Sequence, residues 1–209
     1  MSETPSDAAE SQTPAPAPQM LNVPNALSMS RLILACVVFA LIEFDWFLAA
    51  FILFVIAAST DWVDGWWARK FNQVTQLGRM LDPFVDKIII CGTFIFLSAE
   101  YDQGSGIAAW MTTIVVGREL LVTALRSMIE ASGGDFSAGM SGKLKMVFQC
   151  VAVGASLITL SYGVDAAPAW LTTTLFISAF VAVISTVQSG IGYVFAAIRM
   201  TQAKESPAT

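Results

Sequence analysis

The sequence predicts an all-α integral membrane protein with six transmembrane helices. Of its 209 residues, 56% are hydrophobic and only 13% are charged, whereas a soluble domain carries about 25% charged residues. The apolar residues gather in six long stretches, and a spanning helix needs about 20 predominantly apolar residues. We place these spans near residues 26–43, 47–66, 83–100, 108–128, 144–162 and 169–197.

The two ends of the chain differ in composition from the spans. Residues 1–19 are rich in Pro, Ala, Ser and acidic residues, with almost nothing to bury, so we expect a disordered tail. Residues 20–200 would form the six-helix domain, and residues 201–209 a second tail. The sixth span is long enough to tilt or to project past the bilayer.

The distribution of charge predicts how the chain crosses the membrane. The connections after the first, third and fifth spans contain acidic residues but no Lys or Arg, and all eleven basic residues lie on or near the other side. By the positive-inside rule both termini and both long connections are cytoplasmic, in a multi-pass protein of the cell (inner) membrane. The net charge of -5 argues against a nucleic-acid-binding protein, which carries a basic face.

Four aspartates lie where the second and third spans meet the predicted cytoplasmic side. Asp61 and Asp64 are three residues apart, so they lie on one face of a helix. Gly78, Asp82 and Asp86 follow at intervals of four and share one face of the next helix. A short polar connection joins the two helices, which can therefore present four carboxylates to each other near the cytoplasmic surface.

The energetic cost of these acids indicates what accompanies them. An unpaired acid at the centre of a spanning helix costs roughly 2.5–3.5 kcal/mol, so four approach the total stability of a domain, about 5–15 kcal/mol. Nearby basic residues offset part of this cost, and divalent cations offset more. Because the ligand set is all oxygen, it suits Mg²⁺ or Mn²⁺. The chain has no histidine, so a general base here is a carboxylate, a lysine or another group.

Two structural explanations of the same residues stay open. Asp82 could be the N-cap of a helix that begins at Pro83. Asp61 and Asp64 could be interfacial residues paired with Arg69. Each explanation covers one part of the pattern only.

The full pattern resembles the signature of the CDP-alcohol phosphotransferase family. It runs Asp61-x-x-Asp64-Gly65-x-x-Ala68-Arg69, then eight residues, Gly78, three residues, Asp82, three residues and Asp86. The resemblance extends from about Val23 to the sixth span and agrees with the six-span fold of that family. It implies an enzyme that cleaves the diphosphate of a CDP-linked lipid or alcohol, transfers the phosphoryl-containing group to a hydroxyl and releases CMP.

The resemblance also implies roles for individual residues. Asp61, Asp64 and Asp82 would be ligands of Mg²⁺ or Mn²⁺, two ions being expected, and Asp86 would be a ligand that also acts as the base. Contacts with CDP-diacylglycerol would come from Asn25, Ser28, Gly65, Arg69, Thr75 and Gly78. Members of the family are typically homodimers, so we expect a homodimer embedded in membrane lipid.

Basic residues in the later spans indicate the acceptor. Arg118 and Arg126 are eight residues apart, on roughly one helical face, and Lys143 and Lys145 begin the fifth span. Cations there are costly unless they meet an anion or pair with an acid such as Glu119. We expect Arg118, Arg126 and Lys143 to bind a phosphate on the acceptor. Alternatively, Lys145 and Arg126 extend to the cytoplasmic surface, as long basic side chains often do.

The segments GRELLVTALR and SGKLKMVFQ, with VPN, TDWVDGWWAR and LDPFVDK, resemble the family members that join CDP-diacylglycerol to glycerol-3-phosphate. Gly117 and Met146 depart from that pattern. The implied reaction transfers the phosphatidyl group to glycerol-3-phosphate, in phospholipid biosynthesis, at a site facing the cytoplasm. Two alternatives remain: the same chemistry with inositol phosphate, serine, choline or phosphatidylglycerol as acceptor, and a divalent-cation transporter.

Overall fold

The computed structural model describes the backbone of residues 23–71, 76–131, 140–163 and 165–205, and the side chains of 29–60, 84–85, 87–128, 145–163 and 165–198. The predicted terminal tails therefore lie outside the described residues, apart from 201–205. The described chain is all-helical, without strands. Its elements are α1 (Val23–Glu43), α2 (Phe47–Phe71), α3 (Gln76–Ala99), the 3-10 helix η1 (Glu100–Gln103), α4 (Ala109–Ala131), α5 (Met140–Tyr162) and α6 (Ala169–Glu205).

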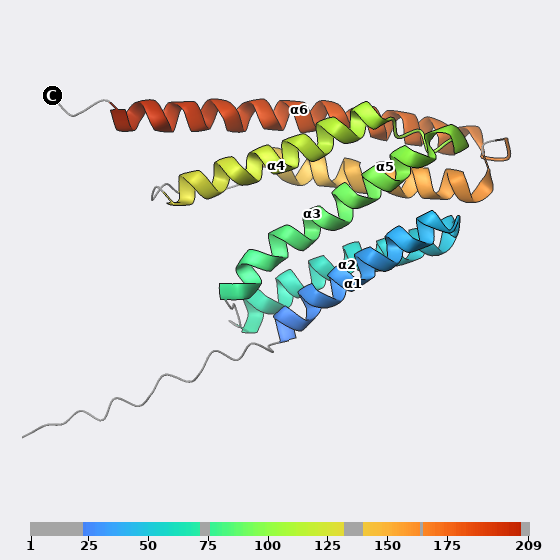
Figure 1. Cartoon of the computed structure of the whole chain (residues 1–209), viewed down its shortest axis with the longest axis horizontal. Helices are drawn as coiled ribbons and strands as arrows, with labels where there is room; N and C mark the ends of the chain where they lie inside the picture. The colour runs from blue at the N-terminus through green and yellow to red at the C-terminus, as the bar shows by residue number, and fades with distance from the viewer. Residues whose placement is uncertain (1–22, 72–75, 132–139, 164, 206–209) are drawn as a thin grey trace, which may run out of the picture.

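The helices run back and forth between two ends of a bundle (Figure 1). One end, called here the aspartate end, holds the start of α1, the end of α2, the start of α3, the α4–α5 junction and the end of α6. The opposite end holds the other three connections. Helix α1 packs against α2 and α3, α6 packs against α4 and α5, and α3 and α5 connect these two groups. The alternation agrees with the predicted order of spans.

The start of α3 corrects one sequence-based alternative. The helix begins at Gln76 rather than at residue 83, so Pro83 lies inside it and Asp82 is not its N-cap. Pro83 has no N–H to donate to the carbonyl of Arg79, four residues earlier. Proline is common at the first position of a helix, but in this chain residues 76–82, which precede Pro83, are already helical. At the other end of the chain, α6 extends to Glu205, beyond the predicted boundary at 197.

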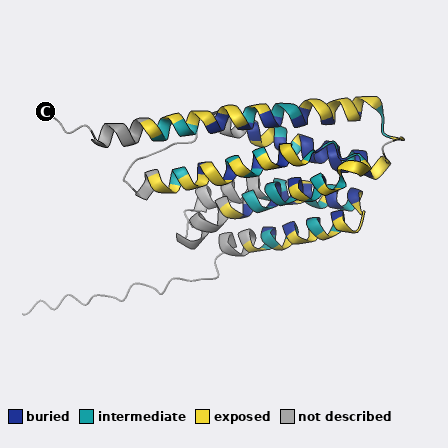
Figure 2. Cartoon of the chain, turned by 45° about the horizontal axis from the view of Figure 1, so that its top comes forward, coloured by how far each residue is buried: buried dark blue, intermediate teal, exposed yellow. Residues whose placement is uncertain are grey.

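The surface of the bundle is apolar, and its mainly apolar interior also contains polar side chains. Ile33, Phe176 and Ile184 are each 63% exposed, and exposed positions follow the outward faces of the helices (Figure 2). An apolar surface of this extent is costly in water and suits lipid. Among the described residues, two stretches are long and apolar enough to cross a membrane, Lys145–Tyr162 and Ala169–Ile198. The structure thus indicates a membrane protein.

Polar side chains in the interior link neighbouring helices. Thr112 Oγ1 of α4 donates to the carbonyl of Phe94 in α3 at 3.0 Å. Gln149 Nε2 of α5 donates to Thr186 Oγ1 of α6 at 3.2 Å. Such bonds contribute about 0.6 kcal/mol each within a membrane, so they fix the register of the helices more than they stabilise the fold.

The end opposite the aspartates is acidic. Partial burial raises the pKa of Glu100, in η1, and the negative charges of Asp45 and Glu43 raise it further. Three carboxylates from two connections therefore lie near one another at this end. This placement agrees with the separation of acidic and basic residues along the sequence.

Phe39 of α1 packs directly against the backbone of α3 at a glycine, Gly92. Phe39 of α1 stacks on Phe96 of α3, with ring centroids 5.1 Å apart and planes at 9°. A Cβ added to Gly92 would lie 2.2 Å from Cζ of Phe39. Only a glycine leaves room for this ring, so Gly92 sets how closely the two helices pack.

We expect Gly92→Ala to lower the Tm of the detergent-solubilised protein by about 5 °C, because Phe39 must leave its stacked position. The matched control is Gly192→Ala, where an added Cβ meets nothing within 4 Å and alanine is the better helix former. Equal Tm values for the two variants would contradict the proposed role of Gly92.

Candidate active site

The backbone places the signature residues on two helices, as predicted. Asp61 and Asp64 lie within α2, and Gly78, Asp82 and Asp86 lie within the single uninterrupted helix α3. Their spacings of three and four residues therefore put each set along one face of its helix. The side chains of these residues, and that of Arg69, lie outside the described residues.

The chain brings the two aspartate helices to the same end of the bundle. Helix α2 ends at Phe71 and α3 begins at Gln76, so the two helix ends lie within roughly 18 Å of each other, at the aspartate end in Figure 1. Thr75 belongs to the intervening 72–75 segment, outside the described residues. Aspartate side chains offer only oxygen donors, the chemistry that a hard divalent cation prefers. Among the described side chains, no group of three Cys, Asp or Glu residues offers another metal site.

Helix α1 begins at the same end. Asn25 and Ser28 lie in its first two turns, and their side chains are not described. Arg31, one turn further on, is only 4% exposed, so α1 carries a buried cation on its side that faces the bundle. The sequence signal for a role of Arg31 inside the bundle is a basic residue within an apolar helix.

Arg118, on α4, is held by contacts from two helices. Its side chain is 9% exposed, and its Nη1 donates to Glu119 Oε1 at 3.3 Å. Its Nη2 donates to Ser189 Oγ of α6, and the guanidinium carbon lies 5.3 Å from the ring centroid of Tyr193, a cation–π distance. The arginine is therefore oriented within the bundle instead of extending into solvent.

Glu119 binds a second cation. Lys145 Nζ of α5 donates to the same Glu119 Oε1 that Arg118 contacts, and Lys145 is only 5% exposed. The alternative in which Lys145 reaches the cytoplasmic surface is therefore wrong. A carboxylate inside the bundle gives this ammonium group a partner, and a paired charge can stay buried. Glu119 therefore pairs with both Arg118 and Lys145, one of the two ways in which a basic residue is tolerated inside a span.

The predicted acceptor site has two more basic residues, Arg126 and Lys143, and the structure describes the side chain of Arg126 only. Arg126 lies two turns after Arg118 on α4 and is partly buried. Lys143 lies in the first turn of α5, and its side chain is not described. The structure thus gathers Arg118 and Lys145 around one carboxylate, a group of three that the sequence did not specify.

Lys87 links the aspartate helix to the basic helix. It follows Asp86 directly on α3, and its Nζ donates to Thr123 Oγ1 of α4. The Thr123 hydroxyl in turn donates to the backbone carbonyl of Glu119 at 2.6 Å. A pocket of about 470 Å³ between α3 and α4 is lined by Lys87, Glu119, Thr123 and Cys91 together with apolar side chains. The helix that contains Asp82 and Asp86 is therefore packed against the helix that contains Arg118 and Glu119.

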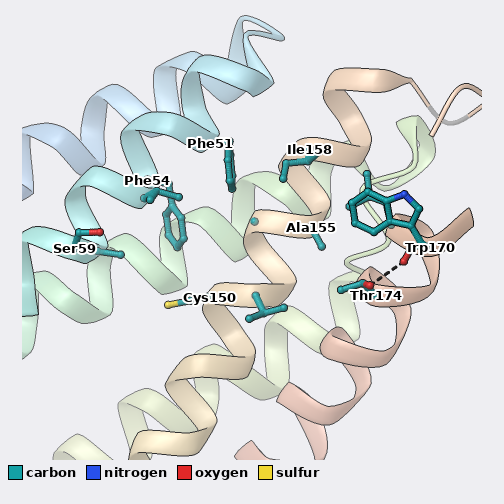
Figure 3. Close-up of a pocket in the computed structure, with 13 residues that line it drawn as sticks. Phe51, Phe54, Ser59, Cys150, Ala155, Ile158, Trp170 and Thr174 are labelled. Atoms are coloured by element: carbon teal, nitrogen blue, oxygen red, sulfur yellow. Dashed lines mark hydrogen bonds between the residues drawn. The ribbon is translucent and has the colours of Figure 1, made fainter. Parts of the chain in front are cut away.

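An apolar groove of about 480 Å³ lies between α2, α5 and α6. Phe51 and Phe54 point from α2 toward α5, and Trp170 of α6 lies at the far end (Figure 3). Ser59, at the near end, is two residues before Asp61. The groove therefore runs from the aspartate helix along the bundle and offers space for an apolar group beside the candidate site.

Comparison with known proteins agrees with this arrangement. Three curated relatives carry the name CDP-diacylglycerol–glycerol-3-phosphate 3-phosphatidyltransferase. The one from Bacillus subtilis is 38% identical over 154 residues, which cover 66% of this chain and 78% of the relative. Those from Salmonella choleraesuis and Escherichia coli are 33% and 32% identical, and each match covers 63% of this chain and 74% of the relative.

The match to a protein family covers most of the chain. The sequence model of the CDP-alcohol phosphatidyltransferase family matches residues 21–188, a range that includes the aspartates of α2 and α3 and the basic residues of α4 and α5. The chain therefore belongs to the CDP-alcohol phosphatidyltransferase family.

Proposed function

We propose that this protein transfers the phosphatidyl group of CDP-diacylglycerol to glycerol-3-phosphate, releasing CMP and forming phosphatidylglycerophosphate for phospholipid biosynthesis. The observation that carries the proposal is the group of buried cations around Arg118, one helix away from the aspartates of the family signature. The proposal is also supported by the relatives, which are 32–38% identical to this chain and are named as CDP-diacylglycerol–glycerol-3-phosphate 3-phosphatidyltransferases. An acceptor that carries its own phosphate explains why α4 keeps cations inside an apolar bundle.

The proposed topology has six spanning helices, both termini in the cytoplasm and the active site at the cytoplasmic face of the cell membrane. The alternating helices, the acidic opposite end and the basic residues near the aspartate end support it. As in other members of the family, the functional unit is proposed to be a homodimer.

In the proposed site Asp61, Asp64, Asp82 and Asp86 hold two Mg²⁺ or Mn²⁺ ions. When bound, such ions neutralise the negative charge of the diphosphate as it is cleaved. Asp86 also accepts the proton of the glycerol 1-hydroxyl. The resulting oxygen attacks the phosphorus that bears the lipid, and the bond to CMP breaks. No histidine is needed, in agreement with the composition.

The donor is proposed to lie between the start of α1 and the α2–α3 connection. Gly65 and Gly78 let its head group approach the backbone, and Arg69 binds a phosphate. The full proposed donor set is Asn25, Ser28, Gly65, Arg69, Thr75 and Gly78. A diacylglycerol chain occupies the apolar groove, entering sideways from the bilayer. The acceptor phosphate binds to Arg118, Arg126 and Lys143.

The experiment that tests the function is an acceptor panel. With CDP-diacylglycerol and Mg²⁺ or Mn²⁺, the purified protein should release CMP when glycerol-3-phosphate is added, and not with inositol phosphate, serine, choline or phosphatidylglycerol. CMP release that depends on one of the others would replace the proposed acceptor. Metal flux into liposomes without any CMP release would favour a transporter instead.

The proposed base is tested by Asp86→Asn. The amide cannot accept the proton, so we expect turnover to fall by at least about 10²-fold, while metal-dependent binding of CDP-diacylglycerol and the Tm stay near those of the parent. Binding is measured by calorimetry and turnover by CMP release. Turnover within a few-fold of the parent would exclude Asp86 as the base.

The groove is tested by filling it. Gly154→Leu should raise the KM for long-chain CDP-diacylglycerol several-fold, because even a Cβ at this position lies 3.2 Å from Cε2 of Phe51. A short-chain donor should be affected less. Val151→Phe, at the partly exposed rim, serves as a second variant that spares the core. Ala40→Leu, which adds bulk to the exposed outer face of α1, is the control. Equal effects on long-chain and short-chain donors would contradict the proposed occupant.

A further inference from the structure

Glu119 is a buried anion between two buried cations. It is 8% exposed, and its Oε1 accepts from Arg118 Nη1 at 3.3 Å and from Lys145 Nζ. Two positive charges and one negative charge leave this group of three with a net charge of +1. A net positive charge inside an apolar bundle is costly until an anion arrives, so the group favours a bound anion.

The contacts of Arg118 leave part of its guanidinium for a ligand. Of its five N–H donors, one contacts Glu119 and one contacts Ser189. Its Nε is buried and has no hydrogen-bond partner among the residues that the structure describes. Because a guanidinium is planar and rigid, holding two of its N–H groups fixes the directions of the other three.

Lys145 differs from Arg118 in what it contacts. Its ammonium group comes from α5 and meets the carboxylate of Glu119 on α4. A buried carboxylate is stable only when it is paired with cations or hydrogen-bond donors. Lys145 therefore balances the charge of Glu119, and that charge strengthens the hydrogen bond by which Glu119 orients Arg118.

We propose that Glu119 is a positioning residue for the acceptor: it holds Arg118 in the orientation that binds the phosphate, and Lys145 is the counter-ion of Glu119 instead of a ligand of the substrate. This inference rests on the proposed function, because it assigns the anion to the phosphate of glycerol-3-phosphate. In this inference Arg118 of α4 binds the substrate, whereas Lys145 of α5 acts only through Glu119.

The test compares Glu119→Gln with a double variant, Glu119→Leu with Lys145→Met. We expect Glu119→Gln to raise the KM for glycerol-3-phosphate about tenfold, the effect of one weakened charge-assisted hydrogen bond. The KM for CDP-diacylglycerol should stay unchanged and kcat should change less than threefold. Arg118→Ala should raise the same KM at least as much. Glu100→Gln, an acid at the opposite end, is the control and should leave both KM values unchanged.

The double variant separates positioning from stability. Replacing both members of a buried ion pair by apolar residues is much less costly than removing one member, so the Tm of the double variant should lie above that of Glu119→Leu alone. The KM for glycerol-3-phosphate should stay raised about tenfold, as in Glu119→Gln, because Lys145 itself does not bind the phosphate.

Three results would overturn the inference. An unchanged KM for glycerol-3-phosphate in Glu119→Gln would exclude positioning. A double variant with the KM of the parent would show that the pair is only structural. A double variant with a KM far above that of Glu119→Gln would make Lys145 a substrate ligand. Failure of the proposed function is seen separately, in the parent protein, which would then release no CMP with glycerol-3-phosphate.

Discussion

The constraint on which this structure depends is the cost of ionised groups inside an apolar bundle. The outer faces of the helices are apolar, so a charge in the interior needs a partner of opposite charge beside it. Glu119 supplies that partner for Arg118 and Lys145. The same requirement applies to the four aspartates of α2 and α3, whose proposed partners are divalent cations.

The helices that carry these groups are connected by a small number of polar contacts. Helix α3 carries Asp86 and, directly after it, Lys87, which bonds to Thr123 of α4. The hydroxyl of Thr123 bonds to the backbone of Glu119, so the register between α3 and α4 also sets the position of the basic group. Helix α5 contributes Lys145 at the aspartate end and lines the apolar groove further along. In the proposed reaction, one set of helix contacts thus positions donor, acceptor and base together.

Predictions from the sequence were most accurate for features that lie within a single helix, such as an apolar stretch or the spacing of two aspartates. The six helices and the phase of the aspartates follow from local periodicity, and the backbone agrees with both. The alternative in which Asp82 caps a helix that begins at Pro83 is wrong, because proline is common at the first position of a helix and also occurs inside helices of this kind. The alternative in which Lys145 extends to the membrane surface is also wrong; a lysine near the end of a span often does so, and the distance from Lys145 to Glu119 depends on how α4 and α5 pack.

The sequence by itself determined the helical class, the order of apolar stretches, the separation of acidic from basic connections and the family signature, since all of these are properties of neighbouring residues. Only the tertiary structure decided which charges pair. Glu119 and Lys145 are 26 residues apart, and Arg118 and Ser189 are 71 apart. Contacts over such separations depend on how the helices pack, and packing is a property of the whole bundle. The apolar groove, lined by three helices, was decided in the same way.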